Sequence, residues 1–183
     1  MAVSMNRLTR LALISLFIFS ALGLYFADRA REPSIVEFIG GQWAMWSQIS
    51  LGFAVGLLSG WVAWWWIKQD FMSDVRNKYV NLFKSFRLST ADIVVISLCA
   101  GIGEELFFRG AIQSYLGVIW TSILFVALHG YLNPRDWAMA SYGLLMTLII
   151  VALGYMTETI GIVSSIVAHV MIDLYLLYQM RRA

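Results

Sequence analysis

The sequence predicts an all-α protein, a polytopic bundle of about six transmembrane helices. Of its 183 residues, 60% are hydrophobic and only 13% are charged, whereas soluble domains carry about 25% charged residues. Apolar runs long enough to cross a bilayer recur along the whole chain. No internal repeat or low-complexity tract divides it, so we expect a single integrated membrane domain. A formal net charge of only +2 gives no reason to expect nucleic-acid binding.

The first span follows a basic start. Arg7 and Arg10 precede an apolar run from Leu11 to Phe26, and a charged cluster from Asp28 to Glu32 follows it. This pattern fits either a cleaved signal peptide or a signal anchor that is kept as a transmembrane helix. We expect a retained anchor, because no small-residue cleavage site follows and much more membrane sequence does.

The second span runs from Trp43 to Ile67, with tryptophans at both ends that are typical of aromatic belts at membrane interfaces. Gly52, Gly56 and Gly60 recur every four residues and would let a second helix approach closely. We expect this face to pack within the chain, with homodimerisation as the alternative. The sequence leaves the oligomeric state open.

The segment from Lys68 to Thr90 is predicted as the one extended polar loop, and its basic residues outnumber its acidic ones. The positive-inside rule places such a loop in the cytoplasm. Arginines at both ends of the chain agree with this orientation. The protein is therefore expected in the cell membrane, multi-pass, with both termini cytoplasmic.

The second half of the chain is predicted to hold the remaining spans. The third begins near Ala91, and the others cover about Ile112 to His129, Trp137 to Tyr155 and Ile160 to Tyr178. We therefore distinguish residues 1–90, with two helices and the basic loop, from residues 91–183, which hold the remaining spans. Residue counting places His129 nearer the cytoplasmic side than Glu104, so a boundary is misplaced or a helix is tilted or broken.

The most informative stretch is GIGEELFFRGAIQ, from Gly101 to Gln113. Two adjacent carboxylates in apolar surroundings cost several kcal/mol each unless they are paired or meet trapped water. On a helix, Glu105 and Arg109 share a face and can form an ion pair, whereas Glu104 points about 100° away. Glu104 is thus free for another role. The plainer alternative is that both carboxylates are solvated at a helix end.

Both histidines of the chain also fall within predicted spans. His129 ends the run FVALH, and His169 lies in the run AHVMID with Asp173 four residues later. Either histidine alone could be a packing residue. Because buried polar groups need partners, we expect Glu104 and these three residues to converge on one wet pocket inside the bundle.

Such a pocket suits hydrolysis. A carboxylate and a histidine that share a water form a general base, and a second histidine can stabilise an oxyanion. The same residue types would also hold zinc with one position open for water. Spacing does not choose between the two, although the HExxH signature of soluble zinc proteases is absent.

Three ordered motifs carry a family resemblance. EELFFR resembles the EExxxR motif of the CPBP intramembrane proteases, also called the Abi family, which includes the type II CAAX prenyl endopeptidases. FVALH is similar to that family's FxxxH motif, and HVMID to its HxxxN/D motif. The resemblance covers about Ala91 to Tyr178 and includes both histidines.

The resemblance implies a role for each motif residue. Glu104 and His129 would activate the catalytic water, with Glu105 and Arg109 as a supporting ion pair. His169 and the residue four positions later would form the oxyanion site. That residue is Asp173 rather than an amide, and an ionised aspartate cannot donate a hydrogen bond. Asp173 must therefore be protonated, orient His169 or bind a metal.

The resemblance favours a metal-free mechanism with no cofactor. Zinc remains possible, and its ligands would then be Glu104, His129, His169 and Asp173. The expected partners are the lipid bilayer and a membrane-associated protein or peptide substrate, such as a bacteriocin-like leader or a C-terminal sorting anchor in a prokaryote.

Two other functions compete with the protease. One is a non-catalytic scaffold or bacteriocin self-immunity protein that keeps the polar cluster for fold specificity. The other is a small proton-coupled transporter or channel subunit, which would be expected to show internal symmetry.

Overall fold

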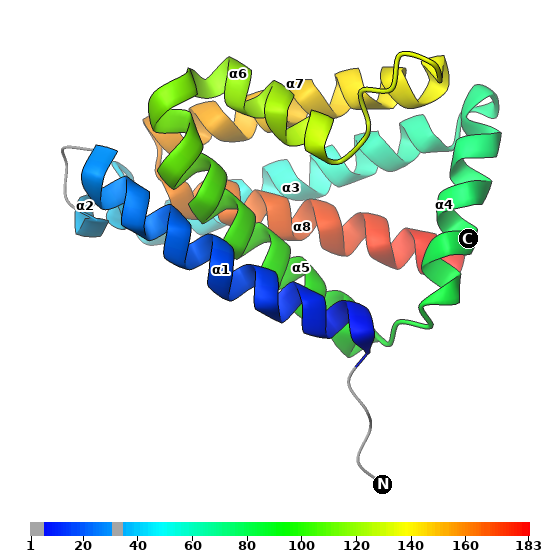
Figure 1. The fold of residues 1–183 in the computed structure, drawn as a ribbon, viewed down its shortest axis with the longest axis horizontal. Coiled ribbons are helices and arrows are strands. Elements are labelled where there is room, and N and C mark those ends of the chain that lie inside the picture. The colour runs from blue at the N-terminus through cyan, green and yellow to red at the C-terminus, as the bar shows by residue number, and fades with distance from the viewer. Residues whose placement is uncertain (1–5, 31–34) are drawn as a thin grey trace, which may run out of the picture.

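The computed structural model describes residues 6–30 and 35–183, and the regular elements of these residues are all helical. In chain order they are α1 (Arg7–Ala30), α2 (Ile35–Gly40), α3 (Met45–Ile67), the 3₁₀ helix η1 (Asp70–Met72), α4 (Ser73–Ser85), α5 (Thr90–Glu105), the π-helix η2 (Leu106–Ile112), α6 (Gln113–Leu128), α7 (Trp137–Thr159) and α8 (Ile162–Arg182) (Figure 1). The predicted all-α bundle is confirmed. Of the predicted charged cluster, Arg31 and Glu32 lie outside the described residues.

Five segments of the described chain are long and apolar enough to cross a membrane, where about six were predicted. They are Arg7–Arg29, Met45–Ile67, Thr90–Leu128, Trp137–Thr159 and Ile162–Arg182. The number differs because the expected third and fourth spans form one helical run without a loop between them. Residues 68–90 also differ from the predicted loop, since they contain η1 and α4.

The run Thr90–Leu128 bends sharply at Gly117, whose φ of 70° and ψ of 172° are not helical. Glycine adopts this backbone conformation readily because it has no Cβ. Figure 1 shows the chain turning back within α6. Glu104 lies thirteen residues before the bend and His129 twelve residues after it. At 1.5 Å per residue, both lie about 18–20 Å along the chain from the bend, which removes the predicted mismatch in depth.

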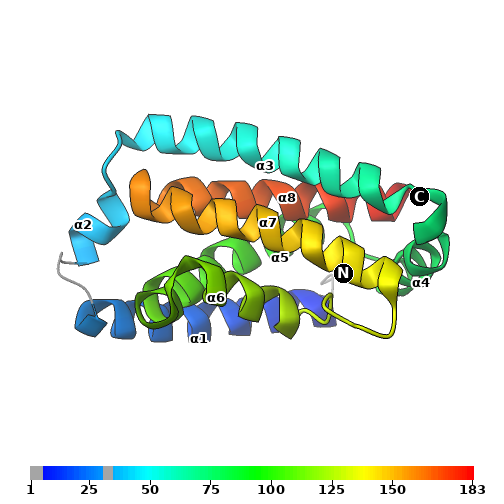
Figure 2. The same cartoon turned by 90° about the horizontal axis from the view of Figure 1, so that it is seen from above.

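The glycine face of α3 packs within the chain, as predicted. Gly52, Gly56 and Gly60 are buried where α3 lies along α8 (Figure 2). A methyl group at Gly56 would collide with the Ala168 backbone of α8. The absence of side chains on this face therefore lets the two helices approach closely.

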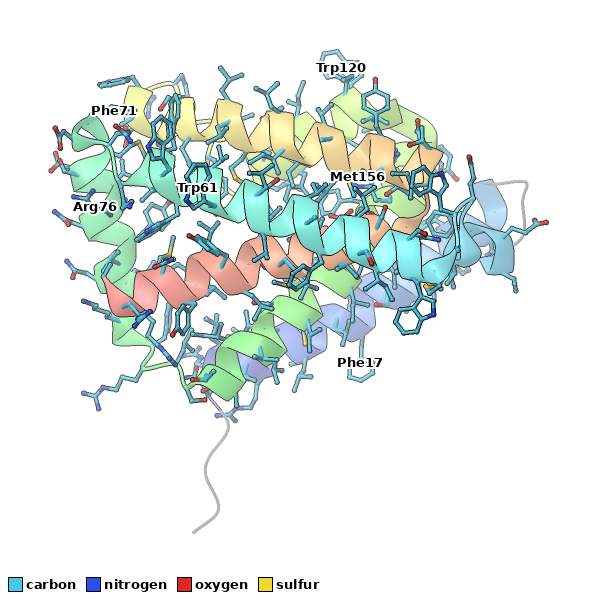
Figure 3. All side chains as sticks on the ribbon, turned by 180° about the vertical axis from the view of Figure 1, so that it is seen from behind. Phe17, Trp61, Phe71, Arg76, Trp120 and Met156 are labelled. Atoms are coloured by element: carbon cyan, nitrogen blue, oxygen red, sulfur yellow. The ribbon has the colours of Figure 1, made fainter. Side chains whose placement is uncertain are left out.

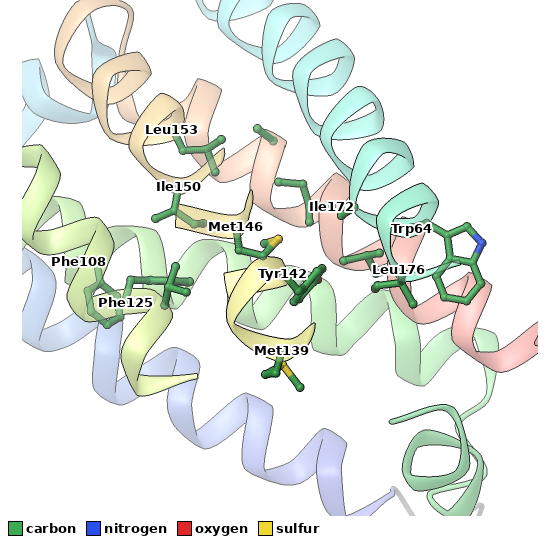
Figure 4. Close-up of a cluster of buried hydrophobic side chains, with 14 of the residues drawn as sticks. Trp64, Phe108, Phe125, Met139, Tyr142, Met146, Ile150, Leu153, Ile172 and Leu176 are labelled. Atoms are coloured by element: carbon green, nitrogen blue, oxygen red, sulfur yellow. The ribbon is translucent and has the colours of Figure 1, made fainter. Parts of the chain in front are cut away.

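A hydrophobic core joins α3, α6, α7, α8 and η2. Its buried side chains include Trp64, Phe108, Phe125, Met139, Tyr142, Met146, Ile150, Leu153, Ile172 and Leu176 (Figure 4). Trp64 was expected in an interfacial belt, but it is only 8% exposed and belongs to this core. By contrast, Phe17 and Trp120 point away from the bundle, as expected of side chains that face lipid (Figure 3).

The start of α1, the start of α5 and the end of α8 lie at one end of the bundle. The Asn6 amide donates to the Phe86 carbonyl at 2.6 Å, and Thr9 Oγ1 donates to Asp92 Oδ1 at 2.6 Å. Arg181 Nη1 donates to Thr90 Oγ1 at 3.0 Å. The two ends of the described chain therefore share one side of the bundle. That this side is cytoplasmic stays a prediction.

Candidate active site

The EELFFR motif spans a change in helix type. Glu104 and Glu105 end α5, whereas Arg109 lies in the π-helical segment η2. π-Helical turns are rare and are frequent at functional sites, because the extra residue per turn re-aims the side chains. At this level α1 lies close to η2, and a Cβ at Gly110 would approach within 3.0 Å of the Gly23 carbonyl oxygen.

Glu105 is fully buried between two partners. Arg109 Nε donates to its Oε2 at 2.8 Å, and His169 Nδ1 lies 2.9 Å from its Oε1. A buried carboxylate needs such partners, because transfer from water to a low-dielectric interior costs several kcal/mol. Glu105 is therefore held in place, and it fixes the ring orientation of His169.

Arg109 extends the polar network toward α7. Its side chain is fully buried, with Nη1 donating to Gln113 Oε1 and Nη2 to the Ile150 carbonyl, both at 3.0 Å. The Gln113 amide in turn donates to the Gly154 carbonyl at 3.2 Å and to Glu158 Oε1 at 3.1 Å.

Gln113 was not singled out as a site residue from the sequence. The available signal was an amide inside an apolar run, four residues after the arginine. Its buried contacts make it part of the network around Glu105.

Glu104 turns away from this network and faces His129. Glu104 Oε2 lies 3.6 Å from His129 Nε2, and it is buried without a hydrogen bond to any described residue. The solvated helix-end alternative does not describe this carboxylate, since its side chain is only 20% exposed. A buried acceptor without a donor marks a place for water or substrate.

His129 is held by the end of α6. Its Nδ1 lies 2.7 Å from the Phe125 carbonyl oxygen, and its ring stacks on Phe125 with centroids 4.4 Å apart. Since a carbonyl only accepts, the hydrogen-bond network assigns the proton to Nδ1 and leaves the Nε2 lone pair facing Glu104 in the neutral ring. Partial burial lowers the pKa of His129, which lies just past the end of α6, and so favours this neutral form.

His169 and Asp173 project from one face of α8. His169 Nε2 lies 3.8 Å from Asp173 Oδ2, beyond hydrogen-bond distance. Because Glu105 holds Nδ1, the second nitrogen of His169 is directed away from the ion pair and toward Asp173.

The polar side chains meet in one cavity of about 510 Å³. Glu104, His129, His169 and Asp173 all line it, whereas Glu105 and Arg109 lie behind its wall. The remaining wall is mainly apolar and comes from α1, α3, η1, α4, α5, α7 and α8. Six spans were not needed to bring these residues together, because the bend at Gly117 returns His129 to the level of Glu104.

Tyr131 also lines the cavity and was not expected as a site residue. Burial and the neighbouring Asp173 carboxylate raise the pKa of its phenol well above the ordinary value, so the hydroxyl stays protonated and can donate. The loop after α6 thus contributes a polar group that motif spacing did not indicate.

The described side chains do not form a ready metal site. No three His, Cys, Asp or Glu residues within 6–30 and 35–183 are grouped as a metal ion would require. Of the four predicted ligands, His169 already uses Nδ1 for the contact with Glu105 Oε1 at 2.9 Å. The zinc alternative stays a prediction, and metal analysis of the purified protein tests it directly.

Comparisons with known proteins agree with the motifs. The chain is 28% identical over 171 residues to the uncharacterized protein YpbD of Bacillus subtilis (strain 168), an alignment that covers 92% of this chain and 86% of that protein. No solved structure matches the chain. Residues 86–175 match the family described as type II CAAX prenyl endopeptidase Rce1-like, and this segment contains Glu104, Arg109, His129 and His169. Residues 86–175 are therefore similar to the Rce1-like family of type II CAAX prenyl endopeptidases, in agreement with the three motifs.

Proposed function

We propose that this protein is an intramembrane endopeptidase that hydrolyses a peptide bond near the membrane, with water activated by Glu104 and His129. One observation carries the proposal. A buried carboxylate oxygen without a hydrogen-bond donor lies 3.6 Å from an imidazole nitrogen, at the wall of a cavity large enough for a peptide side chain. The match of residues 86–175 to an endopeptidase family also supports it.

The first step follows from the two acceptors. Neutral His129 presents the Nε2 lone pair, because its Nδ1 proton is used by the Phe125 carbonyl. Ionised Glu104 presents a second acceptor. A water that donates one hydrogen to each would direct its own lone pair at a substrate carbonyl carbon. As the oxygen attacks, Glu104 takes the proton, and the carbonyl oxygen gains the negative charge.

The second step needs a donor for that oxyanion and a proton for the leaving amine. His169 supplies the donor when its ring is protonated, because Glu105 accepts from Nδ1 and leaves the Nε2 proton available. Asp173 is then an orienting residue that faces the same nitrogen at 3.8 Å, since an ionised carboxylate cannot donate. As the carbon–nitrogen bond breaks, protonated Glu104 returns its proton to the amine.

The cavity suggests the substrate class. Its wall is largely apolar, so it suits aliphatic or aromatic side chains of a membrane-associated protein tail or leader. Bacteriocin-like leaders and C-terminal sorting anchors both have this character. Glu104 and His129 would then act on a peptide bond held at the wall of this apolar cavity.

The test is a comparison of membrane proteins in cells that carry the wild-type chain, Glu104→Gln or the matched control Asp74→Asn. Asp74 is an exposed carboxylate in the first turn of α4. We expect Glu104→Gln to fold normally, as judged by circular dichroism, and to abolish the new peptide termini that mass spectrometry detects with wild type and with Asp74→Asn. Retained biological function in Glu104→Gln would favour the scaffold or self-immunity alternative. Stoichiometric zinc in the purified protein would overturn the metal-free mechanism.

A further inference from the structure

A second, smaller pocket lies outside the cavity of the candidate active site. Its volume is about 100 Å³, and it is bounded by the end of α4, the turn that follows and the facing sides of α5 and α8. Water occupies about 30 Å³ per molecule in the liquid, so the pocket holds roughly three waters or one small polyatomic ion. It is too small for a peptide segment.

Three basic side chains line this pocket: Lys84, Arg87 and Arg181. No acidic side chain lines it, and the ion pairs of the described residues do not include any of these three cations. Arg181 is positioned by donating to Thr90 Oγ1 at 3.0 Å. Three like charges around one small pocket repel one another, and an anion bound between them would relieve this repulsion.

The backbone of Arg87 has an unusual, left-handed conformation. Its φ of 51° is the only positive value among the described residues other than glycines. A left-handed conformation is unfavourable for a long side chain, at a cost of roughly 1–2 kcal/mol. The turn therefore keeps Arg87 beside Lys84 although glycine or asparagine would fit the backbone better.

The pocket lies at one end of α5 and α8. α5 begins at Thr90 and α8 ends at Arg182, so the pocket sits at the ends of two helical segments that are long and apolar enough to cross a membrane. Below the cations, its wall is formed by apolar side chains of the same two helices, including Ile93 and Leu177. A ligand with a negative head and an apolar tail matches this order of charge and hydrocarbon.

We propose that Lys84, Arg87 and Arg181 form a binding site for the phosphate of an anionic phospholipid, whose acyl chain runs along α5 and α8. The phosphate would sit among the three cations, and the chain would contact the half-buried Leu177. This site adjoins the cavity of the candidate active site, because Phe83 and Leu177 line both, but Glu104 and His129 do not line it. The proposal does not depend on protease activity.

The experiment uses the full-length protein in a neutral detergent. Thermal unfolding is followed during titration with phosphatidylglycerol, with phosphatidylcholine of the same acyl chains, or with inorganic phosphate. We expect phosphatidylglycerol to stabilise the protein at concentrations where the other two have no effect, and the effect to weaken with salt.

The variants are chosen to separate this pocket from general surface charge. In Arg87→Asn the new residue tolerates the left-handed backbone, and we expect about fivefold weaker binding for the loss of one cation. Arg181→Lys keeps the charge and should bind nearly as wild type. The matched control is Lys78→Gln, since Lys78 is an exposed cation of α4 outside the pocket.

Three results would overturn the proposal. Equal weakening by Lys78→Gln and Arg87→Asn would mean that the lipid responds to overall charge. Equal stabilisation by phosphatidylcholine would mean that the acyl chain alone binds, and equal stabilisation by inorganic phosphate would mean that the ligand is a free ion. Because the readout is unfolding rather than proteolysis, each result is independent of the Glu104→Gln test.

Discussion

Replacing Arg109 by methionine should strongly destabilise the protein. The arginine is fully buried and donates to Glu105, Gln113 and the Ile150 carbonyl at 2.8–3.0 Å. Methionine fills a similar volume but leaves the Glu105 carboxylate without its cation. Breaking one side of a buried ion pair costs about 3–5 kcal/mol, because the remaining charge stays desolvated. We therefore expect a loss of about 3–5 kcal/mol in the free energy of unfolding.

The assay is reversible unfolding of the purified protein in mixed micelles, with SDS as the denaturant. Arg135→Gln is the matched control, because Arg135 lies exposed in the loop before α7. We expect that control to change the free energy of unfolding by less than about 0.5 kcal/mol.

A double variant isolates the ion pair itself. Adding Glu105→Gln to Arg109→Met removes the orphaned charge, so part of the lost stability should return, and the two changes should not be additive. If Arg109→Met costs no more than Arg135→Gln, then Glu105 is solvated or differently paired, and the buried-network reasoning is refuted.

Three further predictions concern the bend at Gly117, the hydrogen bonds of Gln113 and the pH dependence of proteolysis. Gly117→Ala should lower the free energy of unfolding by roughly 1–3 kcal/mol, because a φ of 70° with a ψ of 172° is strained for any residue with a Cβ. The control Gly40→Ala should change it little, because a Cβ at Gly40 meets nothing within 4 Å. Gln113→Leu should cost about 1–3 kcal/mol, because it leaves Arg109 Nη1 and the Gly154 carbonyl without their partner; a neutral result in the same SDS assay would contradict the role given to Gln113. Proteolytic kcat/KM should fall on acidification, because the lowered pKa of His129 keeps its ring neutral until the pH drops through that pKa. A pH profile that is flat or rises through weakly acidic pH would contradict the role of neutral His129 in activating water.

The sequence alone was sufficient to locate the main polar residues. Ionisable side chains are rare in apolar runs, so Glu104, His129, His169 and Asp173 were identifiable without coordinates. The four-residue spacing of Glu105 and Arg109 placed them on one helix face, and they lie 2.8 Å apart. The spacing rule succeeded because an ion pair within one helix depends mainly on local geometry.

Other parts of the site depended on residues that are distant in the sequence. Gln113 is linked to α7 only because the fold brings the Gly154 carbonyl and Glu158 beside it. The sequence predicts Trp64 at a membrane interface, yet in the structure its side chain is buried in the core and lines the cavity. Tyr131 likewise acquires its burial from neighbouring helices.

By itself, the sequence determined that the chain is an α-helical membrane protein and which of its polar groups need buried partners. Hydropathy and local spacing suffice for both, because each reflects the cost of placing polar groups in hydrocarbon. Only the tertiary structure decided that the expected third and fourth spans form one run that bends at Gly117, and that Glu104 and His129 lie 3.6 Å apart. A glycine in an apolar run is compatible with a straight or a bent helix, and the packing of neighbouring helices selects between them.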